Sequence, residues 1–187
     1  MADLRRAFAF LLLAWVGVAM AADDTIRLGD RPKDAPRHAD FPASAFTGRN
    51  AAPDLRSDPR SRHYRTQLRQ WSTERPNFAG HYILATWNCG AGCVEVAIID
   101  AATGRVFHPP ALRSLIVLDV DDELLEDVEG TPRNDFGALH YRVDSRLIEA
   151  VGTPNGRKAE RGVSYYVWER DELKRLRVVP KASQAGR

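Results

Sequence analysis

Cys89 and Cys93 carry the only thiol groups of this 187-residue chain, so they are its first candidates for chemistry. Such a pair can form a structural disulfide, act as a redox-active dithiol or contribute to a metal site. Redox-active pairs favour two intervening residues at the start of a helix, where the helix dipole lowers the pKa of a thiol. Here the three residues Gly90-Ala91-Gly92 separate the cysteines, between two strand-like segments. We predict a structural disulfide and keep thiol-redox chemistry as the alternative.

The remaining side chains form no recognisable catalytic or metal-binding motif. His81, His108 and His140 lack the spacing to the cysteines that zinc sites use. The chain contains neither a Gly-x-Ser-x-Gly nor a His-Glu-x-x-His sequence. Glycan hydrolysis would need a cleft that brings carboxylates such as Asp100 or Asp135 beside aromatic side chains. We therefore assign no catalytic residue, no metal ligand and no cofactor.

The two cysteines bracket the tip of a predicted β-hairpin. The runs 80–88 and 93–100 are rich in β-branched and aromatic residues, and a glycine-containing turn separates them. Side chains alternate along a strand, so Tyr82 should face one side of the sheet and Trp87 the other. A three-residue loop would make the cysteines direct cross-strand neighbours and allow a disulfide to close the tip. The predicted contact surface of this tip consists of Trp87, Asn88, Gly90, Ala91 and Gly92.

The first 21 residues have the features of an export signal. Arg5 and Arg6 precede an apolar run over 7–18, and Ala19-Met20-Ala21 offers small residues for cleavage. The run is shorter than the roughly 20 apolar residues that a membrane-spanning helix needs. We expect cleavage after Ala21, a periplasmic or secreted mature protein and no membrane span within it. An oxidising compartment also favours a disulfide.

The segment after this signal is expected to differ from the rest of the chain. Prolines, glycines and few periodic apolar positions indicate an extended or flexible arm over 22–56. A helix is predicted over 58–74, because Pro59 suits its first position and apolar residues recur on one face. That apolar stripe consists of Tyr64, Leu68 and Trp71.

The remaining sequence alternates strand-like runs with short turns, which favours antiparallel pairing. The fold predicted over 57–181 is a single α+β domain, mainly a meander-like antiparallel sheet of about seven to eight strands with one N-terminal helix packed on it. Residues 182–187 are expected to form a flexible tail. The strands are placed at 80–88, 93–100, 104–108, 114–120, 138–143, 146–152, 162–169 and 173–179.

Charge excludes one class of partner. The formal net charge is +2 at pH 7, which provides no overall field for nucleic acid. Basic residues nevertheless gather around the predicted helix, and they form either a solvated face or an anion-binding face. This cluster consists of Arg56, Arg60, Arg62, Arg65, Arg69 and Arg75.

Five segments carry a resemblance to known proteins: Asn77-Phe-Ala-Gly-His-Tyr82, Thr86-Trp-Asn-Cys-Gly-Ala-Gly-Cys93, Ile98-Ile-Asp-Ala-Ala-Thr-Gly-Arg-Val106, Asp144-Ser-Arg-Leu-Ile148 and Tyr165-Tyr-Val-Trp168. Together they cover about residues 76–179 and resemble a group of small exported bacterial proteins of unknown function. More distantly, the hairpin layout is similar to the periplasmic inhibitors of vertebrate-type lysozyme. Those inhibitors insert a disulfide-bracketed loop into the enzyme's cleft, where a histidine of the loop meets the catalytic acids. The loop of this chain is shorter and contains no histidine.

These observations favour a non-catalytic function. We expect an exported binding or inhibitor-like module that presents its disulfide-closed hairpin tip to a protein or a cell-wall glycan of the envelope. The alternative is an enzyme of the cell envelope, either a thiol-redox enzyme acting through Cys89 and Cys93 or a glycan-directed one.

Overall fold

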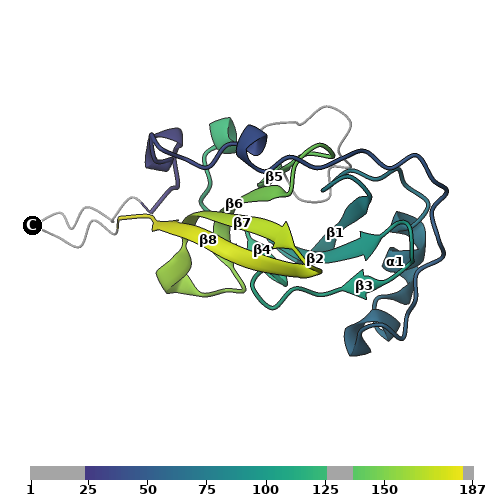
Figure 1. Ribbon diagram of the computed structural model, residues 1–187. Coiled ribbons are helices and arrows are strands. Elements are labelled where there is room, and N and C mark those ends of the chain that lie inside the picture. The colour runs from purple at the N-terminus through teal and green to yellow at the C-terminus, as the bar shows by residue number, and fades with distance from the viewer. Residues whose placement is uncertain (1–23, 126–136, 183–187) are drawn as a thin grey trace, which may run out of the picture.

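The computed structural model describes residues 24–125 and 137–182 (Figure 1). The predicted signal segment, Asp135 and most of the predicted tail lie outside these ranges. The described residues contain the α-helix α1 (Arg65–Trp71) and the 3-10 helices η1 (Leu28–Asp30), η2 (His38–Asp40), η3 (Pro59–Arg62), η4 (Asp122–Leu124) and η6 (Lys158–Glu160). Their strands are β1 (Tyr82–Gly90), β2 (Cys93–Asp100), β3 (Val106–Phe107), β4 (Ser114–Ile116), β5 (Leu139–Tyr141), β6 (Leu147–Pro154), β7 (Gly162–Glu169) and β8 (Glu172–Pro180).

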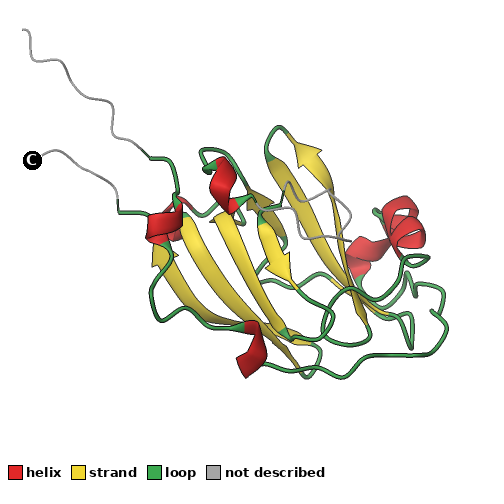
Figure 2. Cartoon of the chain, turned by 90° about the horizontal axis from the view of Figure 1, so that it is seen from above, coloured by secondary structure: helices red, strands yellow, loops and turns green. Residues whose placement is uncertain are grey.

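The strands form one antiparallel sheet in the order β1-β2-β4-β6-β7-β8, with β3 paired to β2 and β5 to β6. This confirms a mainly antiparallel sheet with one α-helix among the described residues. Figure 2 shows the strands side by side with the helices at their margins. Three strands are shorter than predicted, and one of them is β5, which was predicted at 138–143. The segment predicted at 104–108 pairs only over β3, and the one predicted at 114–120 leaves the sheet after Ile116, where the backbone turns through Asp119 at a φ of 56°.

The prediction of one helix over 58–74 is wrong in extent, because the α-helix covers only Arg65–Trp71. The helix is also not N-terminal, because a long described segment precedes it. The Asp58 side chain caps η3 by accepting from the backbone N–H of Arg60, and Pro59 occupies the first turn as expected. Tyr64 then interrupts the helix with φ −98° and ψ 22°. Its ring packs 4.8 Å from that of Trp87, centroid to centroid, so a tertiary contact accompanies the break.

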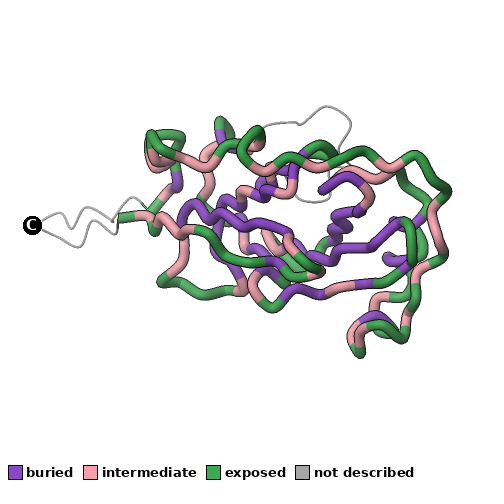
Figure 3. The backbone as a smooth tube through the Cα atoms, viewed as in Figure 1, coloured by how far each residue is buried: buried purple, intermediate pink, exposed green. Residues whose placement is uncertain are grey.

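The sheet curls so that one of its faces packs on itself. Leu84 of β1 and Ile98 of β2 share a buried cluster with Ile148 of β6 and Tyr166 of β7. The ring of Tyr82 meets that of Trp168 edge to face at 5.2 Å, although β1 and β7 are far apart in the strand order. Figure 3 shows most strands largely buried, whereas β8 and the connecting segments are largely exposed.

Two different segments cover the outer faces of this sheet. Leu68 and Trp71 of α1 pack on Ile83 of β1 and Ile99 of β2, as the alternation along β1 predicts. Where β6 and β7 pair, Ile26 and Leu124 of η4 pack on Val151, Val163 and Tyr165. The N-terminal segment 24–56 is therefore extended along the domain and contributes to its core.

The outer edge of β1 is occupied by side chains and a short turn. The Asn77 amide accepts from the backbone N–H of Leu84 at 2.7 Å and donates to the Leu84 carbonyl at 3.2 Å. The Trp71 indole donates to the carbonyl of Thr86 at 2.9 Å. The backbone of Tyr82 exchanges hydrogen bonds with that of Phe78, so the edge groups of three alternate β1 residues are engaged.

Candidate functional site

The Cys89–Cys93 disulfide is present, with an S–S distance of 2.00 Å and a Cα–Cα distance of 5.1 Å. The predicted register of the hairpin is confirmed from Tyr82, which pairs with Asp100, to Asn88, which pairs with Val94, and it is wrong only for the last pair at the tip. Gly90, not Cys89, pairs with Cys93, and a bulge lies between Asn88 and Gly90. The turn is therefore shortened to Ala91-Gly92. The Asn88 side chain supports the bulge by accepting from the backbone N–H of Gly90 at 2.7 Å, a local bond that competes with regular pairing.

The hairpin tip, which we define as residues 88–92, is mostly exposed, in contrast to the buried residues before it in β1. Gly92 has φ +58°, and a Cβ there would come within 2.5 Å of Cδ2 of Leu118. Only glycine fits beneath this leucine without a shift. Leu118 itself is 54% exposed. It thus adds an apolar side chain to the tip that sequence reasoning missed, because a leucine in a strand-like run is ordinarily assigned to the core.

A hollow of about 460 Å³ is lined in part by Leu118, the leucine that lies against Gly92 of the tip. Ile116 contributes a second apolar side chain, and the rim is polar. Arg161 on the rim is held by Asp24 at 3.3 Å and Asp119 at 3.2 Å, so its charge is balanced locally. Leu118 thus lies beside Gly92 of the tip and also lines this hollow.

Trp87, the aromatic member of the predicted contact surface, lies in the core instead. It is 8% exposed and belongs to the cluster beneath α1. Its ring lies 4.8 Å from that of Tyr64 and 6.4 Å from that of His108, centroid to centroid. Trp87 therefore supports the base of the hairpin, and the predicted contact residues brought together at the surface are Asn88, Gly90, Ala91 and Gly92.

A second concave region tests the glycan-directed alternative. It lies at the opposite end of β1 and includes Tyr82, Trp168 and Asp171. Asp171 accepts from the Tyr82 hydroxyl at 3.0 Å and pairs with Arg105 at 2.7 Å. Asp100, the carboxylate considered from sequence, instead accepts from the backbone N–H of Ala102 and the hydroxyl of Thr103 within its own turn. The geometry gives Asp100 a structural role, because its oxygens close the β2–β3 turn.

The three histidines considered as metal ligands have separate surroundings. His81 lies 3.7 Å from Asp100, and His140 is hydrogen-bonded to the Leu124 carbonyl at 2.9 Å. Burial lowers the pKa of His108 to about 4, so its imidazole is neutral near pH 7. Within residues 24–125 and 137–182, no group of three or more His, Cys, Asp or Glu residues is placed to hold a metal ion.

No protein-family model matches the chain, and it has no detectable similarity to a curated protein or to a solved structure. The resemblances drawn from its motifs therefore stay predictions. In the described part of the chain, no helix is long and apolar enough to cross a membrane. The assignment of function accordingly depends on the geometry of the hairpin tip and its surroundings.

Proposed function

We propose that this protein is an exported, non-catalytic binding module whose contact surface is the hairpin tip together with Leu118. The observation that carries this proposal is the contrast along one hairpin. β1 is buried through Trp87, and the tip that follows is exposed, closed by a disulfide and flanked by an exposed leucine. A covalently closed loop loses less conformational entropy when it is held in a complex, which favours affinity.

The partner we propose is an envelope protein with a concave site that receives the tip. A narrow two-residue turn can enter a cleft, and the lack of side chains on the glycines of the tip lets a partner approach the backbone closely. The exposed leucine beside it supplies apolar contact area, which is the main favourable contribution in most protein associations. This arrangement supports an inhibitor-like mode of action. A thiol-redox function receives less support, because the disulfide joins two strands and does not lie at a helix start.

Export has its own test. The full chain should be expressed in a bacterial host and recovered from the periplasm. We expect an intact mass that begins at Ala22 and lies two hydrogens below that of the dithiol, since cleavage follows Ala21 and the cysteines are joined. Retention of the whole chain in the cytoplasm, or free thiols in the unreduced periplasmic protein, would contradict the proposal.

Replacing Ala91 with arginine should separate binding from folding. Ala91 is exposed at the turn, so a long charged side chain there blocks entry of the tip into a cleft without disturbing the core. We expect affinity for a partner captured from periplasmic extract to fall about tenfold or more, which corresponds to about 1.4 kcal/mol. The melting temperature should stay nearly constant. Affinity is measured by calorimetry on the purified pair.

The matched control is Ala102→Arg, which adds the same side chain at an exposed turn of the other end of the hairpin. This variant should bind the partner as the unmodified protein does. Equal binding by a well-folded Ala91→Arg protein would place the contact surface elsewhere and leave the disulfide with a structural role.

A further inference from the structure

A second surface lies away from the hairpin tip. An open groove of about 1020 Å³ runs between segment 45–53 and the end of α1, and it includes Gly80, which precedes β1. Because the tip includes the last residues of β1, the groove and the tip lie toward opposite ends of that strand. Phe46, Leu55 and several alanine and proline residues give the groove an apolar lining. Its charged lining consists of Arg49, Arg69, Glu74 and Arg75.

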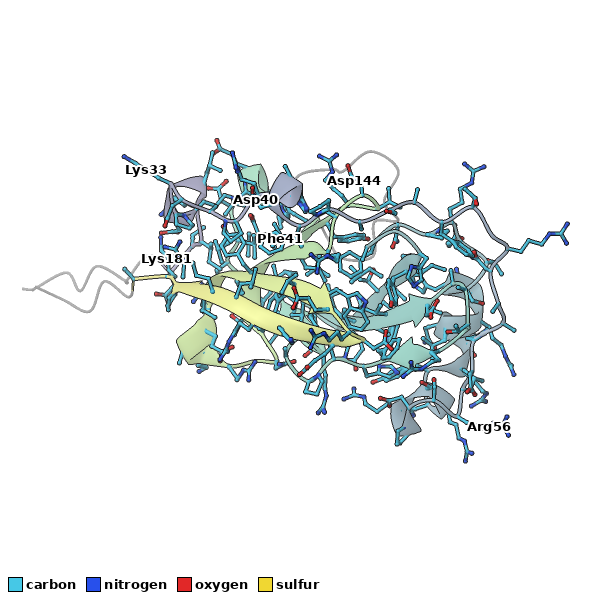
Figure 4. The ribbon with its side chains drawn as sticks, in the orientation of Figure 1. Lys33, Asp40, Phe41, Arg56, Asp144 and Lys181 are labelled. Carbon is cyan, nitrogen blue, oxygen red and sulfur yellow. A yellow bond between two sulfur atoms is a disulfide. The ribbon has the colours of Figure 1, made fainter. Side chains whose placement is uncertain are left out.

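The charge of this groove is not balanced. Among the residues the structure describes, no acidic side chain lies within salt-bridge distance of Arg49, Arg69 or Arg75. Segment 45–76 holds seven arginines and three carboxylates, although the formal net charge of the whole chain is only +2. Arg56, labelled in Figure 4, projects from the same end of the molecule. The positive charge is therefore concentrated around α1.

The backbone at the end of α1 does little to offset this charge. Free carbonyl oxygens at a helix C-terminus would repel an anion. Here the Asn50 amide donates to the carbonyls of Ser72 at 2.9 Å and Glu74 at 2.6 Å. The Thr73 hydroxyl donates to the carbonyl of Gln70 at 2.7 Å. The guanidinium groups thus dominate the electrostatics of the groove.

We propose that this groove binds an anionic polysaccharide, as an activity separate from that of the hairpin tip. Carboxylates of the polysaccharide pair with Arg49, Arg69 and Arg75, because a guanidinium holds a carboxylate through two parallel hydrogen bonds. Sugar rings lie with their C–H faces on the apolar lining near Phe46. An open groove admits an extended polymer, whereas a flat bilayer would meet only its rim.

The test uses the full-length mature protein and an oligogalacturonate as the probe. We expect the triple variant R49Q/R69Q/R75Q to bind the probe about tenfold or more weakly at low ionic strength. Binding by the unmodified protein should weaken as salt is added, since the contacts are ionic. The melting temperature of the variant should match that of the unmodified protein, because these arginines form no salt bridge with a described residue.

The matched control is R62Q/R65Q/R113Q, which removes the same charge from exposed arginines outside the groove. This control should bind the probe within about twofold of the unmodified protein. If both triple variants lose the same affinity for the probe, binding depends only on the net charge of the protein, and the proposal is overturned. Absence of binding by the unmodified protein would also overturn it. If poly-glutamate binds as tightly as the oligogalacturonate, the ligand is an acidic polypeptide and the proposal is overturned. If neutral dextran binds as tightly, the arginines are not the basis of polysaccharide binding, which also overturns the proposal.

Discussion

Leu68→Ala is expected to lower the free energy of unfolding by about 2–5 kcal/mol, because truncation of a buried leucine loses transfer free energy and leaves a cavity. Leu68 is fully buried and belongs to the cluster that joins α1 to β1 and β2. The α-helix has only seven residues, which is too short to be stable by itself, so packing must hold it in place. Urea unfolding followed by circular dichroism measures the change.

Thr66→Ala is the control for this experiment, since Thr66 is exposed on the same helix. It should change the free energy of unfolding by no more than about 0.5 kcal/mol. A loss below about 1 kcal/mol for Leu68→Ala would mean that the helix contributes little to the stability of the sheet.

Arg60→Met is expected to be the second costly change, with a loss of about 2–3 kcal/mol. Arg60 donates to the Glu95 carboxylate, whose side chain is only 8% exposed within β2. Without the guanidinium, Glu95 would be left as a buried charge without its ion pair, which costs far more than the loss of a surface pair. Methionine keeps the apolar stem, so the measurement reports the loss of the guanidinium, which faces Glu95 and also lies over the Tyr64 ring. Thermal and urea unfolding at neutral pH report the effect.

Two companions make the Arg60 result specific. Arg62→Met, at an exposed position of η3, should change stability by no more than about 0.5 kcal/mol. Adding Glu95→Gln to Arg60→Met should restore part of the lost stability, because it removes the unpaired charge. Similar losses from Arg60→Met and Arg62→Met would show that Glu95 does not depend on its partner.

The hairpin and most strands could be predicted because their signals are local. Alternation placed Ile83 and Tyr82 on opposite faces, and both faces proved to be buried, by α1 on one side and by the curled sheet on the other. The length of the helix could not be predicted in this way, because it depends on a contact with a residue distant in sequence. Tyr64 leaves the helical conformation beside Trp87, a residue distant in sequence that no spacing rule connects to it.

The candidate contact surface was predictable only in part, for the same reason. The disulfide and the glycine turn follow from two cysteines on neighbouring strands. The bulge at Cys89 depends on the Asn88 side chain, and the exposure of Leu118 depends on where β4 leaves the sheet. The roles of the individual arginines also could not be predicted, because each depends on which residues surround it in the folded protein. Arg60 has a buried partner, whereas Arg69 lines an open groove.

The occupied edge of β1 has a consequence for how this protein meets other chains. Asn77 and Trp71 use their side chains to fill hydrogen-bonding positions that a further strand would need. At the other edge, β8 carries the charges of Lys174, Arg175 and Arg177, which discourage pairing by a neighbouring molecule. Extension of the sheet by a partner's strand, or by a second copy, is therefore disfavoured at both ends. This arrangement favours recognition through side chains and loops, and concentrated solutions of the protein should resist edge-to-edge aggregation at β1 and β8.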